Sequence, residues 1–165
     1  MNRIILFLIF PFLFSCASDK EEGTVVSDQT LVNMAKSISS FTYYKINDDT
    51  LATDPSSDHG AFIRVRMNPK AISAMNDSVS SLNMASFPDE SMIVKEMYNS
   101  KGGPLAGYVI MYKLRTGSDN NYGWLWGEYD ADGNPFYSVS KKGDRCVSCH
   151  SEPTNADLVR TFSLH

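Results

Sequence analysis

Residues 105–115 read Leu-Ala-Gly-Tyr-Val-Ile-Met-Tyr-Lys-Leu-Arg. In this stretch every second position from 108 to 114 carries a large apolar or aromatic residue, which is the period of a β-strand with one face packed against a core. The turn sequence Lys-Gly-Gly-Pro at 101–104 comes directly before the run. The segment therefore predicts a long strand that begins after a tight turn.

Further strand-like segments flank this run on both sides. They cover residues 61–67, 91–98, 122–127 and 136–139, and residues typical of turns separate several of them. Strands joined by short turns pair in the antiparallel sense. The sequence therefore predicts an α+β fold built on an antiparallel sheet of four to five strands.

Helices are expected at three places. Apolar residues recur at helical spacing from Leu31 to Phe41, with Ser27 available as the N-cap. Asn68 and Pro69 predict the N-cap and first residue of a short helix. Short helices are also expected near residues 146–150, and residues 28–165 are predicted to form a single domain.

The N-terminus has the pattern of an export signal. Arg3 precedes an apolar run from Ile4 to Phe14, which is too short to span a membrane as a helix. Leu-Phe-Ser-Cys at 13–16 resembles the cleavage site of a bacterial lipoprotein. We therefore expect residues 1–15 to be a signal peptide, Cys16 to carry the lipid, and residues 16–27 to form a polar tether. The alternative is an ordinary secretory signal with an unrelated cysteine.

This reading places the protein in the cell envelope, as a periplasmic or outer-membrane lipoprotein held to the membrane by its lipid. The formal net charge is −4, with 15 Lys and Arg against 19 Asp and Glu, which argues against a nucleic-acid partner. Three cysteines, one of them assigned to the lipid, are too few for a disulfide framework.

The most specific motif is Cys-Val-Ser-Cys-His at 146–150. C-x-x-C-H is the attachment sequence of c-type haem, in which Cys146 and Cys149 bond to the haem and His150 binds the iron. We therefore predict one covalent haem c. The alternatives are a redox disulfide, which would be expected beside a βαβ unit, and a structural zinc site, for which only the distant His59 and His165 remain as additional ligands.

The role of such a haem depends on the second axial position of its iron. A strong ligand there favours electron transfer, and an open position favours the binding of small molecules. The candidates for a sixth ligand are His59, His165, Met67, Met84, Met92, Met97 and Met111.

Several segments, read in order, resemble the cytochrome P-460 and cytochrome c′-beta family. They are Asp-His-Gly at 58–60, Asn-Pro at 68–69, Phe-Pro-Asp at 87–89, Ile-Val-Lys-Glu at 93–96, Gly-Tyr at 107–108, the haem motif, and Asp-Leu-Val at 157–159. The resemblance implies a compact, largely antiparallel sheet, a homodimer, and a five-coordinate haem with an open distal pocket.

The family has two functional branches. Cytochromes P-460 oxidise hydroxylamine and carry a bond from a lysine to the haem, and the resemblance maps this lysine onto Lys95. Cytochromes c′-beta lack the bond and bind gases such as nitric oxide. Lys95 shares a strand face with Ile93 and Met97, so burial would lower its pKa, but both faces of this strand are apolar and the pattern does not decide which one is buried.

The distal side of the haem is less well defined by the sequence. The acidic residue that the enzymes carry about ten positions beyond the Gly-Tyr pair has no counterpart before Asp119. Arg64 is a candidate for a cation over the bound ligand, as is Arg66. The candidates for an apolar lining are Phe41, Phe62 and Phe87.

Together these observations favour an exported haem protein that binds small nitrogen oxides or a similar diatomic or nitrogenous molecule, served by a redox partner protein. The alternative is an oxidoreductase acting on hydroxylamine through a haem joined to Lys95. A second alternative is an electron-transfer cytochrome with a strong sixth ligand.

Overall fold

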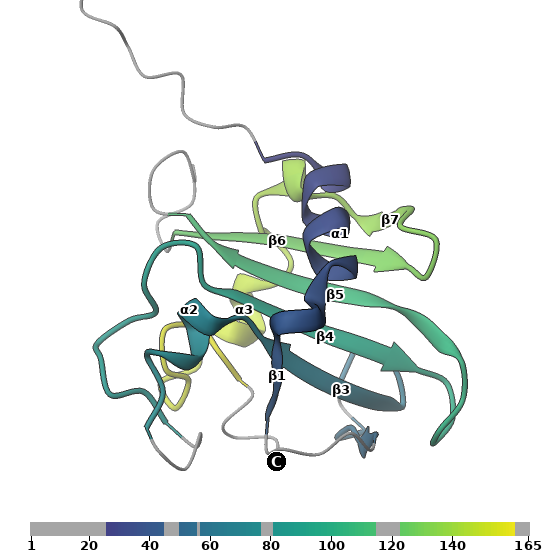
Figure 1. The fold of residues 1–165 in the computed structure, drawn as a ribbon, viewed down its shortest axis with the longest axis horizontal. Helices are drawn as coiled ribbons and strands as arrows, with labels where there is room; N and C mark the ends of the chain where they lie inside the picture. The colour runs from purple at the N-terminus through teal and green to yellow at the C-terminus, as the bar shows by residue number, and fades with distance from the viewer. Residues whose placement is uncertain (1–25, 45–49, 56, 77–80, 115–122, 161–165) are drawn as a thin grey trace, which may run out of the picture.

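The computed structural model describes residues 26–44, 50–55, 57–76, 81–114 and 123–160. Its core is a seven-stranded antiparallel sheet with three short α-helices around it (Figure 1). The strands are β1 (Thr42–Tyr43), β2 (Leu51–Ala52), β3 (Phe62–Met67), β4 (Met92–Tyr98), β5 (Leu105–Lys113), β6 (Trp124–Asp130) and β7 (Pro135–Tyr137). The α-helices are α1 (Asp28–Lys36), α2 (Pro69–Ile72) and α3 (Val147–His150), and the 3₁₀ helices are η1 (Ile38–Ser40) and η3 (Val139–Lys141).

The strands lie in the order β1-β3-β4-β5-β6-β7. β1 pairs with the C-terminal end of β3, and β2 pairs with its N-terminal end. The antiparallel sheet and the N-terminal helix are confirmed, but the predicted count of four to five strands is wrong. The two additional strands, β1 and β2, have two residues each, too few to show an alternating pattern in the sequence. β2 lies within a segment whose composition is that of a loop.

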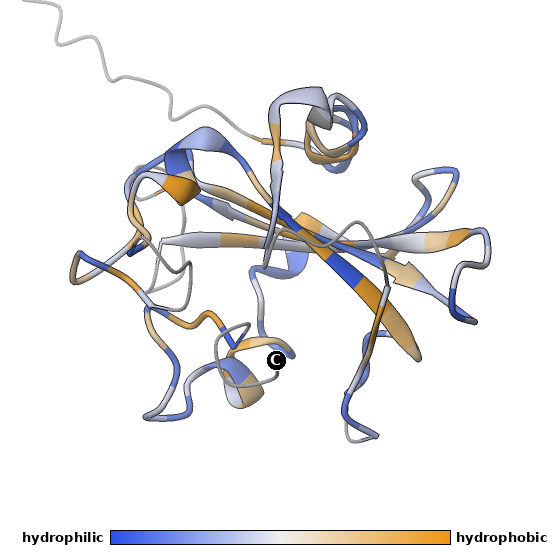
Figure 2. Cartoon of the chain, turned by 60° about the horizontal axis from the view of Figure 1, so that its bottom comes forward, coloured by the Kyte–Doolittle hydropathy of each residue, from blue (hydrophilic) through white to orange (hydrophobic). Residues whose placement is uncertain are grey.

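Two hydrophobic clusters lie on opposite faces of the sheet. One cluster packs under α1 and includes Leu31, Val94 and Tyr129. The other, which includes Trp126, packs against Cys146 at the start of α3. Figure 2 shows α1, reached from the grey N-terminal trace, on one side of the sheet and the helical turn near the C-terminus on the other.

The predicted helix caps are present. The Ser27 hydroxyl accepts a hydrogen bond from Thr30 N at 3.2 Å, and the Asn68 side chain accepts one from Ala71 N at 2.9 Å. Pro69 occupies the first turn of α2. None of the helices in the described ranges is long and apolar enough to cross a membrane.

Asp28 connects α1 to the far edge of the sheet. Its carboxylate accepts hydrogen bonds from the Tyr129 hydroxyl at 2.7 Å, the Ser138 hydroxyl at 2.6 Å and Val139 N at 2.8 Å. Burial alone would raise the pKa of Asp28, but these three hydrogen bonds outweigh it and lower the pKa below its usual value. The ionised carboxylate therefore stabilises the fold.

Replacing Asp28 with alanine should lower the free energy of unfolding at pH 7 by about 1–3 kcal/mol, because the buried Tyr129 hydroxyl loses its acceptor. A carboxyl whose native pKa is lowered contributes stability above its unfolded pKa of about 3.9, and the contribution disappears as the pH falls through the native value. Urea unfolding should therefore show a gap between wild type and variant at pH 7 that narrows toward pH 3. Gln29→Ala, which alters an exposed side chain on the same helix, is the control.

Candidate haem-binding pocket

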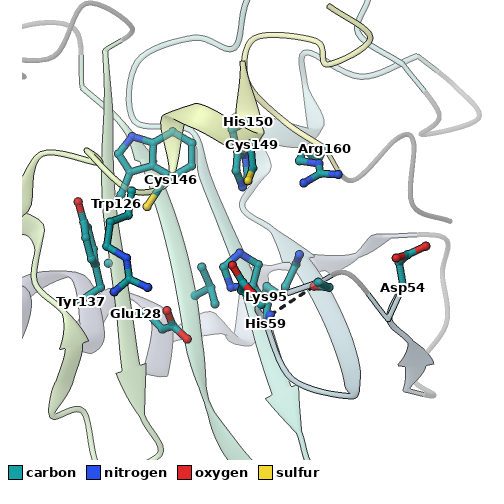
Figure 3. A pocket seen from close by; sticks show the side chains of 15 residues that line it. Asp54, His59, Lys95, Trp126, Glu128, Tyr137, Cys146, Cys149, His150 and Arg160 are labelled. Atoms are coloured by element: carbon teal, nitrogen blue, oxygen red, sulfur yellow. Dashed lines mark hydrogen bonds between the residues drawn. The ribbon is translucent and has the colours of Figure 1, made fainter. Parts of the chain in front are cut away.

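An open pocket lies between α3 and the face of the sheet opposite α1 (Figure 3). Its space, part of which is bulk solvent, amounts to about 880 Å³. It brings together Lys95, Cys146, Cys149 and His150, all of which the sequence singled out. The other lining residues are Asp54, Ser57, Asp58, His59, Val109, Trp126, Gly127, Glu128, Tyr137, Arg145 and Arg160.

The chain enters the motif through a tight turn at Gly143. Gly143 has φ +78°, and a Cβ atom at this position would lie 2.3 Å from Cδ1 of Trp126. Only glycine fits both the backbone conformation and the space. Its carbonyl then accepts hydrogen bonds from the N–H groups of Cys146 and Val147 at 2.9 and 3.0 Å, which begins the helical turn of the motif.

The ring of His150 is held from two sides. Its Nδ1 lies 2.6 Å from the carbonyl oxygen of Leu158, and its ring meets the ring of Trp126 edge to face at 4.8 Å between centroids. A carbonyl only accepts hydrogen bonds, so Nδ1 donates and the lone pair of the neutral ring lies on Nε2. Burial lowers the pKa of His150 to about 4, with a further contribution from the charges of Lys95 and Arg160. His150 therefore presents a neutral imidazole with Nε2 free for a metal.

The loop that supplies the Leu158 carbonyl is fixed by Asp157. The Asp157 carboxylate accepts from Lys113 Nζ at 2.8 Å and from Phe87 N at 2.7 Å, and its carbonyl accepts from Trp124 Nε1 at 3.0 Å. Asp157 and Leu158 both have positive φ, at +50° and +66°. These contacts hold an unfavourable backbone conformation in place next to His150.

Cys146 and Cys149 are free cysteines in this structure. The sheet is antiparallel throughout and contains no βαβ unit. Within the described ranges, no group of three or more His, Cys, Asp or Glu side chains is placed to hold a metal ion. Burial raises the pKa of the Cys146 thiol to about 11, assisted by the charge of Glu128.

Lys95 faces the pocket from the middle of β4, opposite Val65 of β3 and Val109 of β5. The sequence pattern did not decide which face of this strand Lys95 occupies, and the structure shows that it is the face lining the pocket. Burial, together with the charge of Arg160, lowers the pKa of Lys95 to about 8. A substantial fraction of this amine is therefore neutral near pH 8.

Arg64 and Arg66 do not line the pocket. Their side chains lie on the α1 face of the sheet, where both guanidinium groups lie over the Tyr43 ring at 4.2 Å and pair with Glu96 at 3.7 and 3.1 Å. Both arginines also donate to the Tyr43 hydroxyl. Successive side chains of a strand point to opposite faces, and Lys95 pairs with Val65 whereas Arg64 pairs with Glu96. Arg64 and Lys95 therefore lie on opposite faces of the sheet, and the structure does not bring the candidate distal arginine to the haem motif.

The remaining candidates are distributed as follows. Among the candidate sixth ligands, His59 lines the pocket and the five methionines do not. Phe87 lies in the core against Trp124, with ring centroids 5.6 Å apart, and neither Phe41 nor Phe62 lines the pocket. Cys16, Asp119 and His165 lie outside the described residues.

Sequence reasoning missed Arg145 and Arg160, which bring positive charge to the pocket. Their positions in the sequence could have indicated that they lie near the pocket, because Arg145 directly precedes the haem motif and Arg160 directly follows the Asp-Leu-Val segment. Trp126 lies in the segment 122–127 that the sequence predicts to be a strand, but its contact with His150 could not be seen without the fold.

The residues of this pocket fit a haem. The donor set consists of two thiols and a neutral imidazole on one helical turn, and two guanidinium groups can meet the carboxylates of the macrocycle.

An antiparallel sheet with a Cys-x-x-Cys-His turn over such a pocket is the arrangement expected of a c-type haem domain. Residues 42–161 match the model of the family described as Cytochrome P460, and the chain belongs to this family. Membership implies that it is a c-type haem protein. The comparison with curated proteins gives no match.

Proposed function

We propose that this chain is an exported, lipid-anchored protein that carries one covalent haem c and binds small nitrogen oxides at its iron. The observation that carries the proposal is that Cys146, Cys149 and His150 line one pocket. Nδ1 of His150 donates a hydrogen bond to the Leu158 carbonyl, which leaves Nε2 free to bind a metal. Each thiol would add across one vinyl group of the haem: the S–H bond and the π bond of the vinyl group would break, one S–C and one C–H bond would form, and no external oxidant would be needed.

The residues of the pocket have distinct roles in this proposal. His150 binds the iron, and the Leu158 carbonyl and the Trp126 ring fix its orientation. Arg145 and Arg160 offer positive charge to the haem carboxylates. When bound, the haem supplies an iron coordination position on the side away from His150, which a small molecule can occupy.

A second candidate function is the oxidation of hydroxylamine by a haem joined to Lys95. The observation in its favour is that Lys95 lines the same pocket and has a pKa lowered to about 8, which makes its amine a better nucleophile. This function would need a redox partner protein to accept the electrons.

The proposal also includes the location and partners of the protein. Removal of residues 1–15 and acylation of Cys16 would attach the protein to a membrane of the cell envelope, facing the periplasm or the outer surface. The family resemblance further suggests a homodimer. Labelling of cells with a radioactive or clickable fatty acid tests the anchor, since a Cys16→Ser variant should lose the label.

Nitric oxide titration of the reduced, haem-loaded protein separates the two functions. We expect the main absorption band to shift with a single binding isotherm, and the tryptic peptide that contains Lys95 to be recovered free of haem. Recovery of that peptide joined to the haem peptide, with a strongly red-shifted band, would favour the oxidoreductase. A spectrum that nitric oxide leaves unchanged would contradict the proposed binding function.

A further inference from the structure

We propose that Lys113 and Asp157 form a positioning pair, which holds the Leu158 carbonyl on Nδ1 of His150 and thereby sets the reduction potential of the haem iron. The inference rests on the proposed attachment of haem at residues 146–150, with His150 as the iron ligand. It goes beyond that proposal because it gives a functional role to a buried ion pair whose members are not among the residues that line the pocket.

The hydrogen bond between His150 and Leu158 is the contact through which the pair acts. Nδ1 of His150 donates to the Leu158 carbonyl at 2.6 Å. A hydrogen bond at this nitrogen draws the proton away from the ring, which makes the opposite nitrogen, Nε2, a stronger donor to a metal. A stronger axial donor favours oxidised iron, so the position of the Leu158 carbonyl affects the reduction potential.

The Leu158 carbonyl reaches His150 through an unfavourable backbone conformation. Asp157 and Leu158 are consecutive residues with φ +50° and +66°. A side chain with a Cβ atom disfavours this left-handed conformation, and leucine has no polar side-chain atom with which to offset the cost. Such residues persist only where the surrounding structure determines the backbone, and strain of this kind is concentrated at functional sites.

Asp157 supplies contacts that hold this conformation. Its two carboxylate oxygens accept from different partners, Oδ1 from Lys113 Nζ at 2.8 Å and Oδ2 from Phe87 N at 2.7 Å. Its main-chain carbonyl accepts from Trp124 Nε1 at 3.0 Å. Three hydrogen bonds from three separate parts of the chain therefore fix the residue that directly precedes Leu158.

The ion pair between Lys113 and Asp157 lies inside the protein. The side chain of Lys113 is 2% exposed and that of Asp157 is 11% exposed, and the ammonium group lies 4.8 Å from the centroid of the Trp124 ring. Replacing a buried ion pair by apolar residues of similar size often leaves a fold equally stable, so stability alone does not account for such a pair. The position of the pair, two contacts away from the iron ligand, accounts for it better.

The backbone of His150 is held independently of this pair. Asn155 Nδ2 donates to the His150 carbonyl at 2.9 Å, and His150 N donates to the Cys146 carbonyl at 3.1 Å. A shift of residue 157 would therefore move the Leu158 carbonyl relative to the imidazole instead of moving both together. Loss of the ion pair should weaken the hydrogen bond to Nδ1 for this reason.

The experiment measures the reduction potential of the haem-loaded full-length protein and of three variants, Lys113→Met, Asp157→Asn and the two combined. Lys113→Met is the decisive variant, because positioning and simple electrostatics predict opposite shifts. Loss of a positive charge by itself favours oxidised iron and lowers the potential. Loss of the hydrogen bond to His150 weakens the axial donor and raises the potential. In the combined variant the two lost charges cancel, so a rise there also reports the position of the carbonyl.

We expect the potential to rise in all three variants. At the midpoint potential of the wild type, the ratio of reduced to oxidised protein should be about tenfold higher in Lys113→Met, which corresponds to about 59 mV for a one-electron couple. The iron–histidine stretching frequency of the reduced protein, measured by resonance Raman spectroscopy, should fall in the same variants. Asp28→Ala is the control, because it weakens the fold from the α1 side of the sheet and should leave both values unchanged.

A potential that falls in Lys113→Met, or that equals the wild-type value in every folded variant, would overturn the inference. An equal rise in Asp28→Ala would also overturn it, because the effect would then follow stability and not the position of the carbonyl. Circular dichroism verifies that each variant is folded, and the combined variant, which has no unpaired buried charge, decides the question if a single variant does not fold. A peptide map showing haem on residues 146–150 in each sample separates these outcomes from a failure of haem attachment.

Discussion

Replacing His150 with alanine should abolish the wild-type haem spectrum. The substitution removes the imidazole whose Nε2 is free for iron, and it also leaves the Leu158 carbonyl without its 2.6 Å hydrogen bond. The Trp126 ring loses its edge-to-face contact at the same time. We therefore expect no detectable native absorption spectrum from the variant, even where haem remains bonded to Cys146 and Cys149.

Ser148→Ala is the matched control for this experiment. Ser148 lies between the two cysteines and is exposed, and its hydroxyl makes a 3.2 Å hydrogen bond to the Arg145 carbonyl. Its removal should leave the spectrum of the haem unchanged. An unaltered spectrum in His150→Ala would show that another residue binds the iron on this side.

Replacing Lys113 with alanine should cause the largest loss of stability. Lys113 is only 2% exposed, and its Nζ pairs with Asp157 Oδ1 at 2.8 Å and lies 4.8 Å from the centroid of the Trp124 ring. Removal of one partner leaves a largely buried carboxylate unpaired, which costs about 3–5 kcal/mol. Urea unfolding followed by circular dichroism should therefore show a much lower midpoint with a similar slope.

The double variant Lys113→Met with Asp157→Asn tests the cause of that loss. Asparagine tolerates the positive φ of residue 157 and can still accept from Phe87 N, while no buried charge is left unpaired. We expect it to recover part of the stability lost in Lys113→Ala. If the double variant is less stable than Lys113→Ala, an unpaired charge is not the cause.

Lys70→Ala removes an exposed ion pair and is compared with the loss of the buried pair in Lys113→Ala. Lys70 pairs with Glu90 at 3.7 Å, and their side chains are 57% and 63% exposed. Solvent screens such a pair, so its loss should change stability by no more than about 0.5 kcal/mol. Equal effects of Lys70→Ala and Lys113→Ala would mean that burial does not govern these ion pairs.

The sequence predicted the parts of the fold that have a strong local pattern. The segment 61–67 was predicted to be a strand, which β3 confirms, and capping residues located the starts of α1 and α2. It could not show β1 and β2, because two-residue strands have no period. Their existence depends on pairing with β3, which is a tertiary contact.

The site was predictable where its residues are adjacent in the chain and not elsewhere. The haem motif is read directly from residues 146–150. The face of Lys95 could not be chosen, because both faces of β4 are buried, one under α1 and one against the pocket. The face on which Arg64 lies could not be chosen from the sequence either, because only the register of β3 with β4 shows its pairing with Glu96.

The most direct test of this account is a mass spectrum of the protein produced in a host that matures c-type haem. We expect the intact mass to rise by one haem, and the proteolytic peptide with Cys146 and Cys149 to carry it through both sulfurs. Cys146→Ser and Cys149→Ser together should remove that mass. A protein that acquires no haem, or that retains it in the double variant, would contradict the central claim.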